Sequence, residues 1–177
     1  KEHDSIRLTA HGAQNDANGS SCQGCHGDAA LHLEDPAAHK PTNALTAMDA
    51  TATEKTAVCM TCHADSRHLM GWASGVHKKY DVTCINCHSN HTPKSETKQL
   101  KETTITATCA QCHREKAAKM QRSAHMPVRE GKMECTTCHN QHGSTNVRML
   151  RVGNTVNELC TSCHAEKRGP FLWEHPP

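Results

Sequence analysis

Residues 135–142 read Cys-Thr-Thr-Cys-His-Asn-Gln-His, and residues 84–91 read Cys-Ile-Asn-Cys-His-Ser-Asn-His. Both stretches begin with two cysteines three positions apart, followed at once by a histidine. The same Cys-x-x-Cys-His motif occurs six times in 177 residues and accounts for all 12 cysteines. The cysteine pairs are Cys22/Cys25, Cys59/Cys62, Cys84/Cys87, Cys109/Cys112, Cys135/Cys138 and Cys160/Cys163, and the histidines behind them are His26, His63, His88, His113, His139 and His164.

This motif is typical of covalently attached c-type haem. The two thiols add to the vinyl groups of one porphyrin, and the following histidine ligates the iron from one face. Paired cysteines also build zinc ribbons and thioredoxin-like redox sites, but neither needs a histidine directly after each pair. With 16 histidines in the chain, a chance histidine at all six positions has a probability of roughly one in two million. The sequence therefore predicts six haem c groups, held by the 12 cysteines.

The composition predicts a chain with little conventional core. Only 2% of the residues are aromatic, with one Tyr, one Phe and two Trp. A chain of this length normally closes a core with many more large apolar side chains. Six haems would give one porphyrin for about 30 residues, so the porphyrins would supply most of the buried apolar surface. We expect a mainly α fold with extensive loops, drawn out as an extended haem wire, that stays unfolded without haem.

The charge and hydropathy exclude several classes of protein. The formal net charge is only +2, and two propionates on each haem would make the loaded protein acidic, which does not suit a nucleic-acid partner. No stretch approaches the roughly 18 to 20 apolar residues of a transmembrane helix. Covalent haem attachment takes place outside the cytoplasmic membrane in bacteria, so we expect a periplasmic location.

The motifs repeat along the chain. Their first cysteines are separated by 37, 25, 25, 26 and 25 residues. A closer match relates every second motif, because residues 59–91 and 109–142 have the same order of features. Each has a motif, then a histidine, then a second motif, and then a histidine three residues after the second motif. The sequence is therefore divided, within a single multihaem region over 1–177, into two-haem modules at 51–95 and 101–145 and half modules at 8–40 and 154–177. The half modules suit a piece of a longer chain.

Short helices joined by polar loops are expected between the motifs. The best helical stretch runs from Cys109 to Ser123, which is rich in Ala, Lys, Arg and Glu. Thr51 and Glu54 have the spacing of a capping box before the second motif, and Asn157 is the expected cap before the last. Strand signals are almost absent.

Histidines outside the motifs outnumber the distal positions that the haems offer. Sixteen histidines less six in the motifs leave ten, and six haems need six distal ligands. With both faces of every iron closed by imidazole, no position stays open for a substrate, which favours electron transfer and predicts no catalytic residue. The candidate distal ligands are His11, His32, His77, His91, His125, His142 and His175. We expect His3, His39 and His68 to be solvated, and the methionines to serve in packing.

The spacing of two of these candidates restricts which haem they can serve. His91 and His142 each lie three residues after a motif histidine, and on a helix that spacing places both rings on one side. The two axial ligands of one iron must lie on opposite faces of the porphyrin. His91 therefore serves a haem other than that of His88, which brings neighbouring haems close together.

The sequence also resembles a known family over roughly residues 8–177. The stretch from Cys160 to Pro176 (CTSCHAEKRGPFLWEHP) is similar to the MtrA/DmsE-type decahaem periplasmic cytochromes of outer-membrane electron conduits. Residues 135–143 (CTTCHNQHG) and 72–77 (WASGVH) agree with it. Family members carry ten haems, and the six motifs here correspond to the second through the seventh. The positions that match distal ligands of the family are His11, His77, His91, His125, His142 and His175, with a looser match at His32.

This resemblance implies a protein that enters an outer-membrane β-barrel porin. It would pass electrons between periplasmic or inner-membrane carriers and an outer-face multihaem cytochrome. Two alternatives stay open. A multihaem oxyanion reductase would keep one iron open, and a subunit of an extracellular cytochrome filament would receive distal histidines from other copies.

Overall fold

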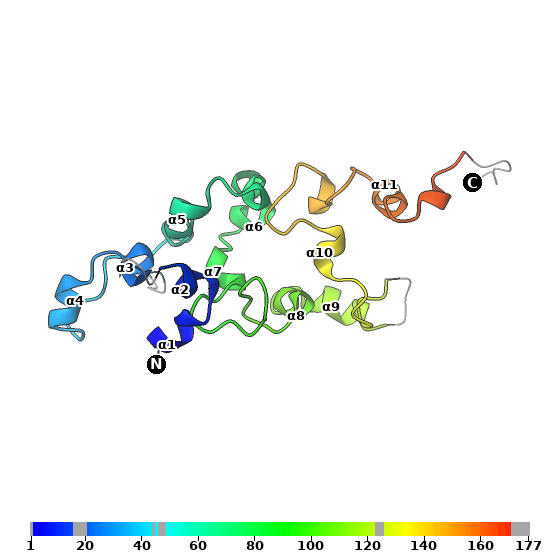
Figure 1. The fold of residues 1–177 in the computed structure, drawn as a ribbon. Coiled ribbons are helices and arrows are strands. Elements are labelled where there is room, and N and C mark those ends of the chain that lie inside the picture. The colour runs from blue at the N-terminus through cyan, green and yellow to red at the C-terminus, as the bar shows by residue number, and fades with distance from the viewer. Residues whose placement is uncertain (1, 16–20, 44, 46–48, 123–125, 171–177) are drawn as a thin grey trace.

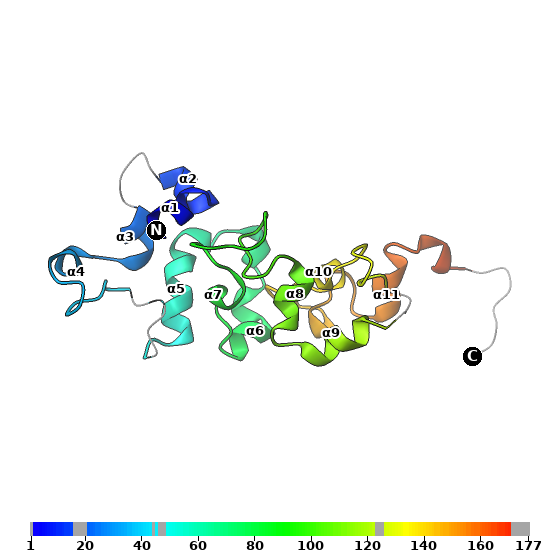
Figure 2. The same cartoon turned by 90° about the horizontal axis from the view of Figure 1, so that it is seen from below.

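The chain forms an elongated array of short helices in a computed structural model that describes residues 2–15, 21–43, 45, 49–122 and 126–170. Figures 1 and 2 show the elements following one long axis in two perpendicular views, with α4 near one end and α11 near the other. The α-helices are α1 (Glu2–Arg7), α2 (Ala10–Asn15), α3 (Ser21–His26), α4 (Ala30–Glu34), α5 (Ala52–His63), α6 (Val76–Lys79), α7 (Cys84–Cys87), α8 (Ile105–Ala110), α9 (Arg114–Met120), α10 (Cys135–Cys138) and α11 (Val156–Thr161). The 3₁₀ turns are η1 (Arg67–Leu69), η2 (Trp72–Ser74), η3 (Val147–Met149) and η4 (Ala165–Lys167).

The described residues contain no β-strand, which confirms the expected mainly helical, loop-rich fold. Isolated antiparallel bridges join His88 to Leu100 and His139 to Leu150. None of the helices among the described residues has the length and apolar composition needed to cross a membrane.

The motifs sit on two kinds of helix that alternate along the chain. The second, fourth and sixth motifs begin inside α5, α8 and α11, whose N-caps are threonines: Thr51, Thr104 and Thr155. The third and fifth motifs form the single turns α7 and α10, after which His88 and His139 take extended backbone angles. In α5, α7 and α10 both cysteines lie on helical backbone three residues apart and so on one face, whereas α8 and α11 end before their second cysteine.

One expected helix cap is confirmed, a second is wrong, and one expected helix is divided. Thr51 and Glu54 form the expected capping box, with the Glu54 N–H donating to the Thr51 hydroxyl at 3.2 Å. Asn157 is wrong as a cap, because Thr155 caps α11 and its N–H and hydroxyl both reach the Glu158 carboxylate. The expected helix from Cys109 to Ser123 is also wrong, because non-helical angles at His113 (φ −90°, ψ 49°) divide it into α8 and α9.

After the third and fifth motifs the chain makes the same closed loop. The Lys101 N–H donates to the Cys87 carbonyl at 2.9 Å, and the Arg151 N–H donates to the Cys138 carbonyl at 2.9 Å. Each loop turns back through two non-glycine residues with positive φ, a conformation that needs support from its surroundings. These residues are Lys98 (63°), Gln99 (49°), Arg148 (54°) and Met149 (54°).

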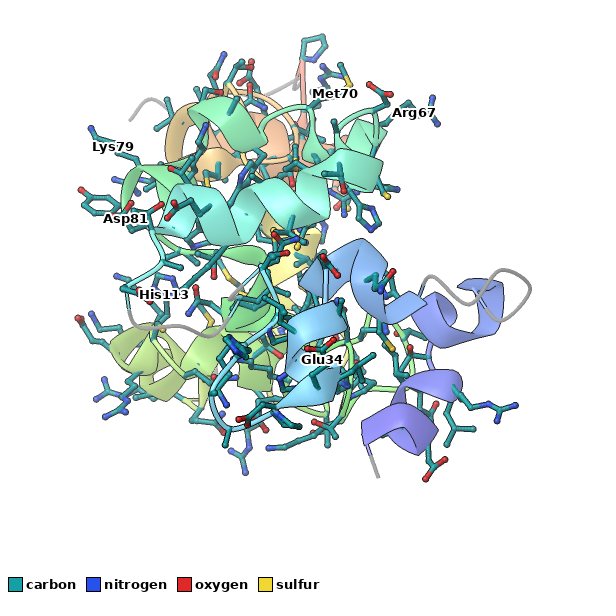
Figure 3. All side chains as sticks on the ribbon, turned by 90° about the vertical axis from the view of Figure 1, so that its left-hand side faces the viewer. Glu34, Arg67, Met70, Lys79, Asp81 and His113 are labelled. Atoms are coloured by element: carbon teal, nitrogen blue, oxygen red, sulfur yellow. The ribbon has the colours of Figure 1, made fainter. Side chains whose placement is uncertain are left out.

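The apolar core is very small. Among the described residues, the buried hydrophobic side chains are Trp72, Leu100, Ile105 and Leu150. Large apolar side chains lie on the surface instead, including Leu8 at 92% exposure and Met70 at 80%. Figure 3, which looks along the long axis, shows Arg67, Met70 and Lys79 at the periphery. The polypeptide thus leaves apolar surface that an attached porphyrin would cover.

Candidate haem-binding sites

Four motif histidines each lie opposite a histidine from a distant part of the chain. His63 of α5 lies opposite His11 of α2, and His26 of α3 lies opposite His91. His113, labelled in Figure 3, lies opposite His77 of α6, and His88 lies opposite His142. The ring centres of these four pairs are separated by 5.9 Å (His11–His63), 6.0 Å (His26–His91), 6.1 Å (His77–His113) and 6.2 Å (His88–His142).

These separations fit two imidazoles on opposite sides of one iron. An imidazole nitrogen binds a first-row transition metal at about 2 Å, so two imidazoles on one metal have ring centres roughly 6 Å apart. His91 lies opposite His26, and His142 lies opposite His88. Neither of them faces the motif histidine three residues before it.

Backbone carbonyls fix the tautomer of several of these rings. The Nδ1–H of His88 donates to the Lys98 carbonyl at 2.8 Å, and that of His139 donates to the Arg148 carbonyl at 2.9 Å. The Nδ1–H of His77 donates to the Gln141 carbonyl at 2.9 Å. A proton held on Nδ1 leaves Nε2 unprotonated, and this is the arrangement in which a metal-ligating histidine is oriented by a second partner.

Burial adds a further constraint at His142. Burial lowers the pKa of His142, and the neighbouring His88 lowers it further, while a hydrogen bond to the His68 backbone acts in the opposite direction. The neutral ring is therefore favoured. Neutral imidazole is the form that binds a metal ion, so this environment suits a ligand.

The cysteines of consecutive motifs lie next to one another. Burial raises the pKa of the Cys25 thiol, and Cys62 of the next motif raises it further. A hydrogen bond between the thiols of Cys59 and Cys84 raises the pKa of Cys59 and lowers that of Cys84 to about 7. Helices α5 and α7, which carry these two cysteines, also pack together.

The same contacts continue through the remaining motifs. Burial raises the pKa of Cys87, with a contribution from Cys112. Burial and the neighbouring Cys135 raise that of Cys109 to about 12, and α8 packs against α10. Burial also raises the pKa of Cys138, as do Cys160 and Cys163 of the last motif. The six motifs therefore follow one another in space in the order of the sequence.

The other predicted ligands are placed as follows. The Nδ1–H of His32 donates to the His39 carbonyl at 2.7 Å, which leaves its Nε2 unprotonated. His164 has its Nδ1 3.4 Å from a Glu166 carboxylate oxygen. His125 and His175 lie outside the described residues. His68, which we expect to be solvated, is exposed; its backbone accepts a hydrogen bond from His142, and its side chain lowers the pKa of His142.

The donor arrangement does not suit a zinc ribbon. In the part of the chain that the structure describes, no three His, Cys, Asp or Glu side chains converge where they could hold a metal ion. None of the 12 cysteines is in a disulfide. Each motif offers two free thiols and one imidazole, the donor set that a porphyrin with its own four nitrogens requires.

Sequence reasoning missed the groups that orient the ligands. The carbonyls of Lys98, Arg148 and Gln141 accept hydrogen bonds from histidine rings, but every residue has a carbonyl, so no residue type marks this role. A partial signal is the recurrence of a Leu after each loop, at Leu100 and Leu150, 50 residues apart.

Comparison with known proteins agrees with this geometry. Residues 22–109 match the family of NrfB-like c-type cytochrome proteins, and residues 125–169 match the family of doubled CXXCH motifs. The chain is 36% identical over 160 residues to the multihaem cytochrome MtrA of Shewanella baltica (strain OS185). This alignment covers 90% of the chain and 46% of the relative, so the chain spans about half the length of that protein. The chain is therefore a multihaem c-type cytochrome that binds haem c, and it is similar to MtrA over 90% of its own length.

Proposed function

We propose that this chain transfers electrons through six haems, each closed by two imidazoles, that follow one another in chain order. The observation that carries the proposal is the set of four ring pairs at 5.9 to 6.2 Å. Bound haem supplies a one-electron iron couple. With both axial positions filled by histidine, the iron has no place for a substrate, so electron transfer is favoured over catalysis and no residue is assigned a catalytic role.

The ring pairs support a specific assignment of ligands. We infer that His91, His11, His142 and His77 close the haems held by His26, His63, His88 and His113, in that order. His11 precedes the first motif and lies opposite the second, while His77 precedes the third and lies opposite the fourth. By the same register His125, which precedes the fifth motif, is the proposed ligand for the haem of His164. His32 and His175 stay proposed iron ligands.

The contacts between consecutive motifs support a linear path. The contacts between motifs alternate between second and first cysteines. The first and second motifs meet through their second cysteines, and the second and third motifs meet through their first cysteines. In the mature protein these sulfurs are thioethers at the porphyrin edges, so neighbouring haems are brought edge to edge. The chain's own contribution is to hold each haem by two cysteines and two histidine rings, one of which comes from a distant segment.

The location and partners are proposed from the family likeness and the shape. The elongated array in Figures 1 and 2 suits a protein that carries electrons over a distance. We propose that the chain works in the periplasm, inserts into an outer-membrane β-barrel porin, and connects periplasmic or inner-membrane electron carriers with an outer-face multihaem cytochrome. The similarity to MtrA supports this assignment.

End-to-end conduction can be measured across a single molecule. All 12 native cysteines are predicted to be thioethers, so cysteines introduced at exposed Leu33 and Lys167 would be the only free thiols and would attach the two ends to two electrodes. We expect current through this Leu33→Cys/Lys167→Cys holoprotein to rise when the applied potential lies within the range of the haem potentials and to fall outside it. The two single-cysteine variants serve as controls. Current that does not depend on potential would contradict conduction through the haems.

A further inference from the structure

Two segments far apart in the sequence touch through their backbones. Gly71, just before η2, lies against Gly143, which follows His142 in the loop after α10. A Cβ atom built on either glycine would overlap the carbonyl oxygen of the other. Figure 1 shows the loop after α10 reaching back to α6. We call this contact of Gly71 with Gly143 the glycine crossing.

The glycine crossing lies between two histidines that face motif rings. His77 follows Gly71 by six residues, and its Nδ1–H donates to the carbonyl of Gln141, 64 residues away, at 2.9 Å. His142 directly precedes Gly143 and hydrogen-bonds to the backbone of His68. Each segment therefore holds the histidine of the other, and at the glycine crossing the two backbones are in direct contact.

We propose that the glycine crossing positions two distal ligands at once, His77 opposite His113 and His142 opposite His88. This inference rests on the proposed bis-imidazole ligation. Because the two rings are bound to the opposite segment by hydrogen bonds, any separation of the backbones moves both rings away from their motif histidines. The glycine crossing would therefore set the coordination of two consecutive haems, those of the third and fourth motifs.

The need for glycine at Gly71 is one of size. Its backbone angles (φ −86°, ψ −5°) are ordinary for any residue, so an alanine there would not be strained by conformation. Its methyl group would instead collide with the Gly143 carbonyl, which is backbone and cannot rotate away. Close approach of two backbones is a common reason for glycine. Gly143 has φ +107°, so substitution there would add backbone strain and would be harder to interpret.

The test is the spin state of the irons in the holoprotein carrying Gly71→Ala. Low-temperature EPR with spin counting, together with mass measurement of the attached haems, should show a full haem count and two high-spin irons per chain. Gly131→Ala is the control, because Gly131 lies outside the attachment motifs and its Cβ would meet no protein atom within 4 Å, so that backbone strain from its φ of +68° is the only cost of the methyl group. Gly75→Ala is a milder variant, since its Cβ would lie 3.3 Å from the Gly143 Cα and 3.2 Å from the Gly71 oxygen. It should give a smaller high-spin fraction.

A Gly71→Ala protein with all haems attached and the wild-type spectrum would overturn the inference, as would a spectrum in which all low-spin signals weaken equally. If the Gly71→Ala protein does not accumulate, the spin state of the Gly75→Ala protein tests the inference instead. A wild-type EPR spectrum from Gly75→Ala would overturn it. Failure of the proposed function is recognised separately, because wild-type protein would then already show high-spin iron before any substitution.

Discussion

Without covalently attached haem, the chain is expected to give the far-ultraviolet circular dichroism of an unfolded polypeptide. The described residues bury only four hydrophobic side chains, those of Trp72, Leu100, Ile105 and Leu150. No side chain of any described residue is fully buried. Isolated helices shorter than about 12 to 15 residues are marginal in water. The longest described helix, α5, has 12 residues, so the helices cannot persist without packing against another surface. The measurement compares chains made with and without the haem-attachment machinery.

The loaded chain should be helical and unfold cooperatively, whereas the haem-free chain should lose nearly all helical signal. Substituting alanine for all 12 cysteines gives a second haem-free sample in which free thiols cannot cross-link. A haem-free chain with the helical spectrum and cooperative melting of the loaded protein would show that the polypeptide forms its own core. The interpretation of the composition would then be wrong.

Replacing His142 by alanine is expected to convert one haem per chain from low spin to high spin. His142 lies 6.2 Å from His88, measured between ring centres, and is the proposed distal ligand of that haem. Alanine has no donor atom, so the iron would keep one axial imidazole and gain an open position. EPR of the oxidised holoprotein would measure the change, and carbon monoxide binding to the reduced protein would give an independent count of open irons.

His68→Ala is the matched control for this substitution. The His68 side chain is exposed and acts on His142 through its charge alone, whereas the hydrogen bond of His142 goes to the backbone at that position, which alanine retains. We expect His68→Ala to leave the spin state unchanged. If His142→Ala also left every iron low spin, the assignment of His142 to the haem of His88 would be refuted.

The haem-binding residues follow from the sequence because their chemistry requires particular residue types. Two thiols and a following histidine identify each attachment motif. The expectation that His91 faces a haem other than that of His88 agrees with the structure, since His91 lies opposite His26. Its helical premise was wrong, because α7 ends at Cys87 and His88 takes extended backbone angles. The capping box at Thr51 could be predicted for a similar reason, because a hydroxyl and a carboxylate three residues apart satisfy each other's backbone N–H groups.

The pairing of the histidines could not be predicted in this way. His11 and His63 are 52 residues apart, and the number of residues between two rings does not determine which rings meet. The glycine crossing is equally hidden, because Gly71 and Gly143 look like ordinary loop glycines until the backbones are placed together. The break of the expected helix at His113 is hidden as well. The residues around it favour helix, and the structure places the His113 ring 6.1 Å from the His77 ring at the break, a long-range contact that local propensity does not encode.

The central claim is that the haems are closed on both faces by histidine, and low-temperature EPR of the fully oxidised wild-type holoprotein tests it most directly. The number of spins would be compared with the iron content of the same sample. The proposed ligation predicts low-spin signals from the haems of His26, His63, His88 and His113, with no high-spin signal assignable to any of them. High-spin iron at one of these four haems, identified by its loss when the corresponding cysteine pair is replaced by alanine, would contradict a conduit of closed haems and would point to an open, reactive site.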